Sequence, residues 1–221
     1  AYDSGFYRVP LGSSGMVTAE EIIGTKNEDG SWTGGGRNYF DYGPWQSLSP
    51  ELERTSVSSR VNYNLTDNIK GFLETSYQSN RTVQWMAPTP AFGDVYDYTV
   101  SADNPFNPFG EEVSFRHRLT EAGSRIFEID TDIFRVLPGI DIDINEKWSA
   151  QAAFLHTTAD SFRLSRNMIS ADAFQDALNS SDPNTAYNVF GDATNQRINS
   201  PEVIDSLKVE SMQKARVEMQ Q

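Results

Sequence analysis

The fold class is decided by one stretch of alternating sequence, residues 54–86, which reads RTSVSSRVNYNLTDNIKGFLETSYQSNRTVQWM. In residues 57–65, apolar or small side chains alternate with polar ones. Successive side chains of a strand point to opposite faces, so this pattern predicts a strand with one apolar and one polar face. Residues 66–68 (Thr-Asp-Asn) favour a tight turn, and the alternation then resumes in residues 69–77 with Phe72 as its exception. The stretch therefore predicts a long antiparallel hairpin.

The polar face of this hairpin carries Arg60, Lys70 and Glu74. A packed core does not accept such charges without a large desolvation cost. Two arrangements remain open at this point. Either the polar face meets water while the other covers a core, or the polar face lines a wet lumen while the other meets lipid.

The composition favours the second arrangement, in which the polar face lines a lumen and the other face meets lipid. Only 38% of the 221 residues are hydrophobic, whereas about 45–50% is usual, yet 12% are aromatic. A polar-lined barrel with aromatic residues at the membrane interfaces has this balance. A glycan-binding β-domain shows the same balance, so that alternative stays open.

Charge and cysteine content exclude several classes of function. The net charge of −13 disfavours nucleic acid as a partner, because its binding depends on clustered Lys and Arg. The chain has no cysteine, which excludes disulfides, thiolate metal sites and cysteine nucleophiles. No apolar run approaches the roughly 20 residues of a membrane helix, although a barrel strand needs only about 10 alternating residues. The chain begins without Met and ends in mid-pattern, from which we expect a piece of a longer protein.

Strand-like alternation returns three more times along the chain. Residues 125–144 alternate with a change of phase at Pro138-Gly139, which predicts a β-bulge there. After a turn at residues 145–147, a strand returns from Trp148, and a fifth strand is predicted over 208–221. Residues 87–124, rich in Pro and Gly, are predicted to lack regular structure. Two short helices are predicted between the fourth and fifth strands, capped by Ser170 and opened by Pro201.

Short turns and long loops thus alternate strictly along the chain, as they do in bacterial outer-membrane barrels. The predicted fold class is all-β: an antiparallel transmembrane β-barrel segment of about five long strands, with short periplasmic turns and long extracellular loops that hold short helices. Residues 1–50 are predicted to be a long extracellular loop region and residues 51–221 a partial barrel.

One motif adds a family resemblance. Residues 104–110 read NPFNPFG and are followed by Arg-His-Arg-Leu at 116–119 and Gly-Ser-Arg at 123–125. This arrangement resembles the barrels of TonB-dependent outer-membrane receptors. The resemblance implies a 22-stranded barrel whose lumen holds a plug domain, of which this chain would be a fragment. It also implies location in the bacterial outer membrane, outer-membrane lipid as surroundings, and TonB as a partner through a plug not seen in this chain. The expected function is active uptake of a scarce iron chelate, cobalamin or glycan.

The candidate ligand-binding residues are aromatic side chains of the loops, which stack on sugar or chelate rings. They are Trp32, Tyr39, Tyr42, Trp45, Tyr96 and Tyr98.

Other chemistry finds less support. The paired carboxylates Asp130/Asp132 and Asp141/Asp143 have the spacing of any polar strand face, so lumen lining is favoured over glycosidase or Ca²⁺ chemistry. In the loop at 103–112, Asp103, Glu111 and Glu112 are a weaker Ca²⁺ candidate. No enzyme, cofactor or metal site is predicted.

Two alternatives remain: a secreted all-β carbohydrate-binding or adhesin module, and, less favoured, a β-rich glycoside hydrolase. Arg135, in phase with Ile133 and Leu137, is the position that disagrees with a lipid-facing strand. The basic cluster Arg116-His117-Arg118 is expected to form ion pairs with Glu111, Glu112 or Glu121.

Overall fold

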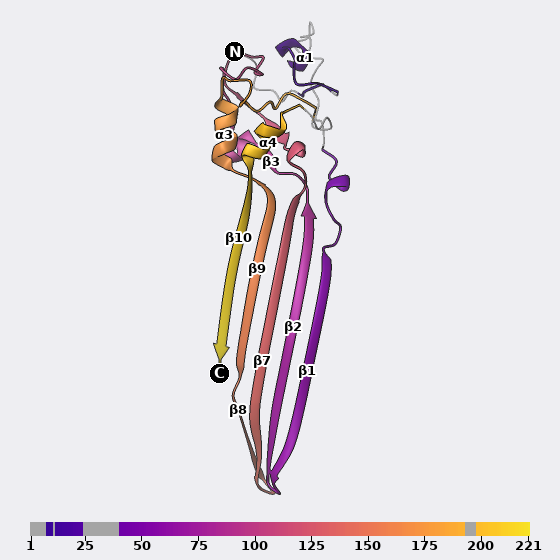
Figure 1. Cartoon of the computed structure of the whole chain (residues 1–221), viewed down its shortest axis with the longest axis vertical. Helices are drawn as coiled ribbons and strands as arrows, with labels where there is room; N and C mark the ends of the chain where they lie inside the picture. The colour runs from indigo at the N-terminus through magenta and orange to yellow at the C-terminus, as the bar shows by residue number, and fades with distance from the viewer. Residues whose placement is uncertain (1–7, 11, 24–39, 193–197) are drawn as a thin grey trace. The chain divides into compact units, whose positions relative to one another are not determined.

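A computed structural model describes residues 8–10, 12–23, 40–192 and 198–221. Strands make up 52% of the described residues and helices 16%, so the fold is all-β, as predicted (Figure 1). The strands are β1 (Glu51–Thr66), β2 (Ile69–Met86), β3 (Pro90–Phe92), β4 (Thr99–Val100), β5 (Val113–Ser114), β6 (Arg116–Arg118), β7 (Arg125–Asn145), β8 (Trp148–Ala153), β9 (His156–Ile169) and β10 (Lys208–Gln220). The helices are α1 (Ala19–Ile23), α2 (Gly93–Tyr96), α3 (Ala171–Asn179) and α4 (Pro201–Leu207), with 3-10 turns η1 (Gly43–Trp45) and η2 (Thr120–Ala122). Within the described ranges, none of the helices has the length and apolar character needed to span a membrane.

The chain divides into two compact units. The loop unit comprises Ala1–Ser47, Trp85–Arg125 and Arg166–Glu210, and the sheet unit comprises Leu48–Gln84, Ile126–Ser165 and Ser211–Gln221.

The sheet unit is built on the predicted hairpin. Strands β1 and β2 pair antiparallel in one continuous register from Glu51↔Val83 to Asn64↔Lys70, and the turn lies at Asp67-Asn68. The order of the sheet is β1-β2-β7-β9-β10, with β8 also paired to β7 (Figure 1). The predicted hairpin and the five long strands are confirmed, although the fourth is interrupted at Phe154-Leu155, between β8 and β9.

The predicted bulge at Pro138-Gly139 is wrong. Arg135 lies 3.2 Å from Glu74, and a Cβ atom built on Gly139 would lie 2.1 Å from the ring of Phe72. Glu74 and Phe72 share one face of β2, so Arg135 and Gly139 share one face of β7 and the alternation does not slip between them. Apolar residues change position along β7 because the two faces of the sheet exchange character along its length.

One face, here called the apolar face, exposes large hydrophobic side chains near the hairpin turns. Tyr63 and Trp148 are 69% and 70% exposed. The other exposed members are Val57, Val61, Leu65, Leu73, Phe134, Ile140 and Ile144. At Tyr77, whose hydroxyl donates to Asp132 over 2.8 Å, this face becomes charged. Arg81 then lies 3.6 Å from Glu128 and 3.9 Å from Asp130.

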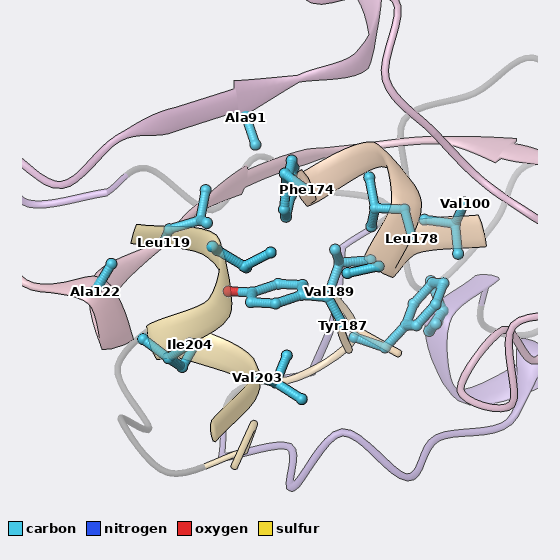
Figure 2. Packing of buried hydrophobic residues seen from close by; sticks show 14 residues of the cluster. Ala91, Val100, Leu119, Ala122, Phe174, Leu178, Tyr187, Val189, Val203 and Ile204 are labelled. Carbon is cyan, nitrogen blue, oxygen red and sulfur yellow. The ribbon is translucent and has the colours of Figure 1, made fainter. Parts of the chain in front are cut away.

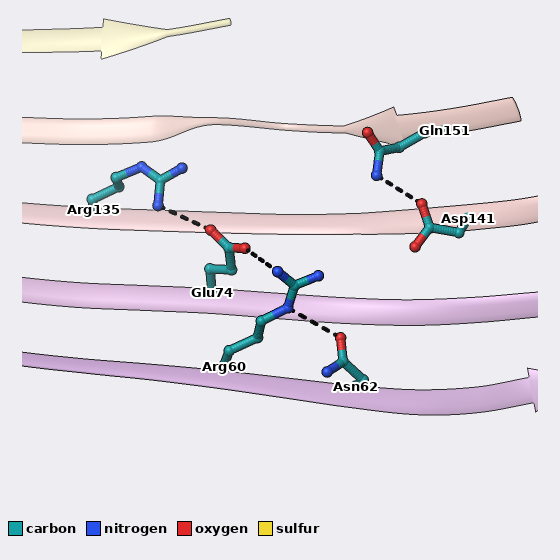
Figure 3. A network of polar contacts seen from close by, with 6 residues as sticks. All are labelled: Arg60, Asn62, Glu74, Arg135, Asp141 and Gln151. Carbon is teal, nitrogen blue, oxygen red and sulfur yellow. Dashed lines mark hydrogen bonds and ion pairs between the residues drawn. The ribbon is translucent and has the colours of Figure 1, made fainter.

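The opposite face, here called the polar face, carries a chain of polar contacts at the level where the first face is apolar (Figure 3). Glu74 bridges two arginines, 3.1 Å from Arg60 and 3.2 Å from Arg135. Gln151 donates to Asp141 over 2.7 Å. Arg135 therefore belongs to a charged network, which removes the disagreement seen in the sequence. The pair Asp130/Asp132 lies at the charged end of the apolar face. The pair Asp141/Asp143 lies on the polar face.

The loop unit has its own hydrophobic core. It is formed by Phe174 and Leu178 of α3, Val203 and Ile204 of α4, and Tyr187 (Figure 2). Leu119, Val100, Ala91, Ala122 and Val189 complete the part of the core labelled in the figure.

Two helices of the loop unit, α3 and α4, begin where the sequence predicts. The hydroxyl of Ser170 accepts from the Ala173 amide over 3.3 Å, and that of Ser200 accepts from Val203 over 3.2 Å ahead of Pro201. Both residues are N-caps of ordinary geometry, so both predicted helices are confirmed.

Residues 87–124 hold more regular structure than expected. They form β3 to β6 and α2, with β3 and β6 paired from Pro90↔Arg118 to Phe92↔Arg116. These strands are too short to show a period, and proline is tolerated at the first position of a strand. In the NPFNPFG motif, the side chains of Asn104 and Asn107 each accept from the amide two residues ahead, over 3.0 Å. The motif is thus a pair of Asx-turns, and Asn104 also donates to the carbonyl of Leu178 over 3.0 Å.

Candidate ligand-binding site

The candidate site is built on the ribbon of β3 and β6 in the loop unit. Side chains alternate across this ribbon, so the pair Ala91↔His117 lies on one side, where Ala91 joins the core. Phe92, Arg116 and Arg118 lie on the other side, which leaves two guanidinium groups beside one phenyl ring.

Arg118 is the centre of an aromatic cluster. Its guanidinium carbon lies 4.9 Å from the ring centroid of Tyr42, 5.5 Å from that of Phe92 and 5.8 Å from that of Phe40. All three distances are within the range of cation–π attraction. The guanidinium also donates to the Tyr42 hydroxyl over 3.0 Å and to the carbonyl of Pro88 over 2.9 Å. These contacts fix its position.

Ring contacts extend the cluster in both directions from Arg118. Phe40 lies 6.1 Å from Trp45, Phe92 stacks on Tyr96 at 6.5 Å, and Tyr96 lies 6.0 Å from Tyr98. We call this set the aromatic–arginine ladder: Phe40, Tyr42, Trp45, Phe92, Tyr96, Tyr98 and Arg118. Tyr42 and Tyr96 are 42% and 51% exposed, so the ladder offers ring surface to solvent. Tyr98 is partly buried and packs on Phe174, and burial raises the pKa of its hydroxyl.

The structure brings together four of the six predicted site residues. Tyr42, Trp45, Tyr96 and Tyr98 all belong to the ladder. The other two, Trp32 and Tyr39, lie outside the described residues. Phe92 and Arg118 were not selected from the sequence. The alternation of Arg116-His117-Arg118 was the available signal, because it places two arginines on one side of a strand.

The arginines of the ribbon have other partners than the predicted glutamates. Arg116 pairs with Asp94, and this ion pair holds the pKa of the Asp94 carboxyl below its usual value. Glu121 instead accepts hydrogen bonds from the amides of Ile198 and Asn199 over 2.6 and 2.9 Å. Glu121 thus stabilises the start of the α4 region and contributes no charge to the ladder.

A second arginine, Arg125, follows β6 closely in the sequence. Its Nε donates to the carbonyl of Ala87 over 2.8 Å, next to the Pro88 carbonyl that holds Arg118. Burial lowers the pKa of Arg125, and the positive charge of Arg118 lowers it further. The two guanidinium groups thus bind the carbonyls of adjacent residues.

His117, on the inner side of β6, has a structural role. Its Nε2 lies 3.2 Å from the hydroxyl of Tyr187, and burial lowers its pKa to about 4. The ring is neutral at physiological pH. In the described part of the chain, no group of three His, Asp or Glu side chains is placed to hold a metal ion.

The geometry of the ladder suits binding of a ring. Exposed tyrosine faces offer stacking surface, and a fixed guanidinium offers hydrogen bonds and positive charge. No family model, characterised protein or solved structure matches this chain, so the interpretation rests on the residues themselves.

Proposed function

We propose that the chain is part of the barrel wall of a TonB-dependent transporter in the bacterial outer membrane. The supporting observation is the exchange of character along the sheet. Near the hairpin turns, one face exposes apolar side chains while the other carries the Arg60–Glu74–Arg135 contacts. In this arrangement the apolar face meets lipid and the polar face lines a wet lumen.

The extent of the apolar face agrees with a membrane. From Val57 to Leu65 the strand rises about 3.3 Å per residue, or roughly 26 Å in all, which is about 20 Å of membrane thickness at a tilt near 40°. The apolar band of outer-membrane barrels is about 25 Å tall. Tyr63 and Trp148 lie near the turn end of the band and Tyr77 lies at its other end, as interfacial aromatic residues do. Beyond Tyr77, the charges of Arg81 and Asp130 suit water.

Further strands would complete the wall. Among the described residues, β1 and β10 are the edges of the long sheet, and each pairs with one neighbour. An open edge has no place in lipid, because its backbone groups would be unsatisfied. We therefore propose that strands of the complete transporter pair with both edges, and that TonB acts through a plug outside this chain.

The loop unit would capture the ligand, an iron chelate, a cobalamin or a glycan, at the aromatic–arginine ladder. Transport of this kind needs binding and displacement of the plug, with no covalent chemistry on the ligand.

Circular dichroism of the purified full chain, with and without detergent micelles, tests the proposal. The expected result is a β-spectrum with micelles and loss of that spectrum without them, because the apolar face needs a lipid-like surface. A cooperative β-fold that melts reversibly in plain buffer would contradict the proposal. The secreted carbohydrate-binding or adhesin module would then be favoured, since the ladder serves ring binding in that class too.

A further inference from the structure

Two arginines of the loop unit, Arg118 and Arg125, bind the carbonyls of adjacent residues and have no carboxylate within 4.0 Å among the described residues. Arg118 and Arg125 are held by the adjacent carbonyls of Pro88 and Ala87, and their remaining contacts in the described part of the chain are to a hydroxyl and to aromatic rings. Six other arginines of this acidic chain lie within 4.0 Å of a carboxylate, namely Arg60, Arg81, Arg116, Arg135, Arg166 and Arg216. Arg54 and Arg163 of the sheet unit contact an amide and an aromatic ring instead.

We propose that Arg118 and Arg125 form an anion-binding subsite of the ladder, which takes the carboxylate of a ring-bearing acid. The proposal rests on the proposed function only in taking the ladder as the place where an external ligand binds.

The hydrogen-bonding capacity of the two side chains supports this assignment. A guanidinium has five N–H donors in a rigid fork. Arg118 uses two of them for Pro88 and Tyr42, and Arg125 uses its Nε for Ala87. Among the described residues, the Thr89 hydroxyl is the only buried side-chain atom without a partner, so the terminal nitrogens of Arg125 are not fully buried. These donors are free to bind carboxylate oxygens, in pairs where the geometry allows.

The charge balance supports an anion as well. Arg118 and Arg125 carry like charges on the carbonyls of adjacent residues, and an anion that contacts both would offset their repulsion. The chain carries 31 acidic side chains, so an arginine would ordinarily be neutralised by a carboxylate of the same chain. Arg116, in the same strand as Arg118, is neutralised in this way by its ion pair with Asp94.

The rings define the rest of the ligand. The partly exposed Tyr42 ring lies beside Arg118, and the exposed Tyr96 stacks on Phe92, which also contacts Arg118. A ring whose carboxylate reached the arginines would lie against these aromatic side chains. A uronic-acid sugar and an aromatic carboxylic acid both have this chemistry.

Binding measured by calorimetry on the full chain, in the medium in which it folds, tests the proposal in two arms. The first arm compares trigalacturonate with its uncharged methyl ester. The second compares 2,3-dihydroxybenzoate with 2,3-dihydroxybenzamide. We expect the acid to bind at least about tenfold more tightly than its neutral counterpart in one arm, with affinity falling as NaCl is added, and the arm that shows this identifies the ring.

The variants R118Q and R125Q are expected to remove the preference for the acid. The substitutions R118K and R125K keep the charge and are expected to keep part of the preference, which separates loss of charge from misfolding. The double variant R116Q/D94N is the matched control, because it removes a neighbouring charge pair and leaves the net charge unchanged.

Two results would overturn the proposal. One is equal binding of acid and neutral counterpart in both arms, including no binding of either. The other is a preference that persists in R118Q and R125Q, or that is lost equally in R116Q/D94N. Failure of the transporter proposal is read separately, from the micelle dependence of folding.

Discussion

The Thr89 side chain, between two prolines of the loop unit, has a buried hydroxyl without a hydrogen-bond partner, alone among the described residues. An unmade hydrogen bond in a buried place costs about 1–3 kcal/mol. Thr89→Val replaces the hydroxyl by a methyl group of similar shape, so we expect the free energy of unfolding to rise by about 1 kcal/mol in denaturant titrations. Thr89→Ser keeps the hydroxyl and should give no such gain. A Val variant less stable than the wild type would contradict the assignment.

His117 predicts a pH dependence of stability. Its pKa is about 4 in the folded chain and about 6.5 when unfolded. Between these values the unfolded state binds a proton that the folded state excludes, so stability falls as the pH is lowered from about 6.5 to about 4, by up to about 3 kcal/mol. Below about pH 4 this contribution no longer changes.

Unfolding measured at intervals from pH 7 to 4.5 checks this slope, and His117→Gln should flatten it. The lower limit keeps the measurement above the range in which Asp94 takes up a proton, because its pairing with Arg116 lowers the pKa of that carboxyl. An unchanged slope in the Gln variant would exclude His117 as its source.

Among the elements, β7 depends on Gly139 because the Phe72 ring of β2 occupies the space of its missing side chain. Gly139→Ala would force a Cβ atom to within 2.1 Å of that ring, and we expect a loss of about 1–3 kcal/mol in the free energy of unfolding. Gly71→Ala is the control, since its Cβ would meet Leu65 at an ordinary 3.5 Å. Equal effects of the two substitutions would show that Phe72 is not the cause.

The same pair shows what sequence reasoning reached in the elements and what it missed. Alternation and turn residues predict the hairpin and the caps of α3 and α4 because these are local patterns. Phe72 interrupts the alternation of its strand. Its ring packs on Gly139 of another strand, and the alternation within one strand cannot reveal such a contact. The apparent bulge at Pro138-Gly139 had a different origin: the two faces of the sheet exchange character along its length, and the period of one strand does not show this.

The candidate site was predictable in part for a related reason. Loop aromatics such as Tyr42 and Tyr96 suggest ring binding by their type alone. Their assembly around Arg118 depends on β3 pairing with β6, and strands of three residues give no periodic signal. The sequence shows which residues are aromatic, but only the pairing of β3 with β6 determines that Arg118 lies among them.

For the molecule as a whole, the assignment of lipid and lumen faces predicts opposite tolerance of charge. Leu73 lies on the apolar face, and Ser76, paired with Ser58, lies on the polar face. We expect Leu73→Arg to destabilise the micelle-bound fold by about 2–4 kcal/mol, whereas Ser76→Arg changes it by less than about 1 kcal/mol. Urea unfolding in micelles measures both. Similar losses in the two variants would contradict the assignment of faces.

The open edges of β1 and β10 also limit how the isolated chain behaves as it folds. Along the 16 residues of β1, alternate backbone amides and carbonyls point away from β2 and offer a template to any extended chain that arrives. Capture by another copy is bimolecular and closure of the hairpin is not, so the yield of single folded chains should drop as protein concentration rises. Dilution during refolding, or a short peptide that occupies an edge, would then improve recovery.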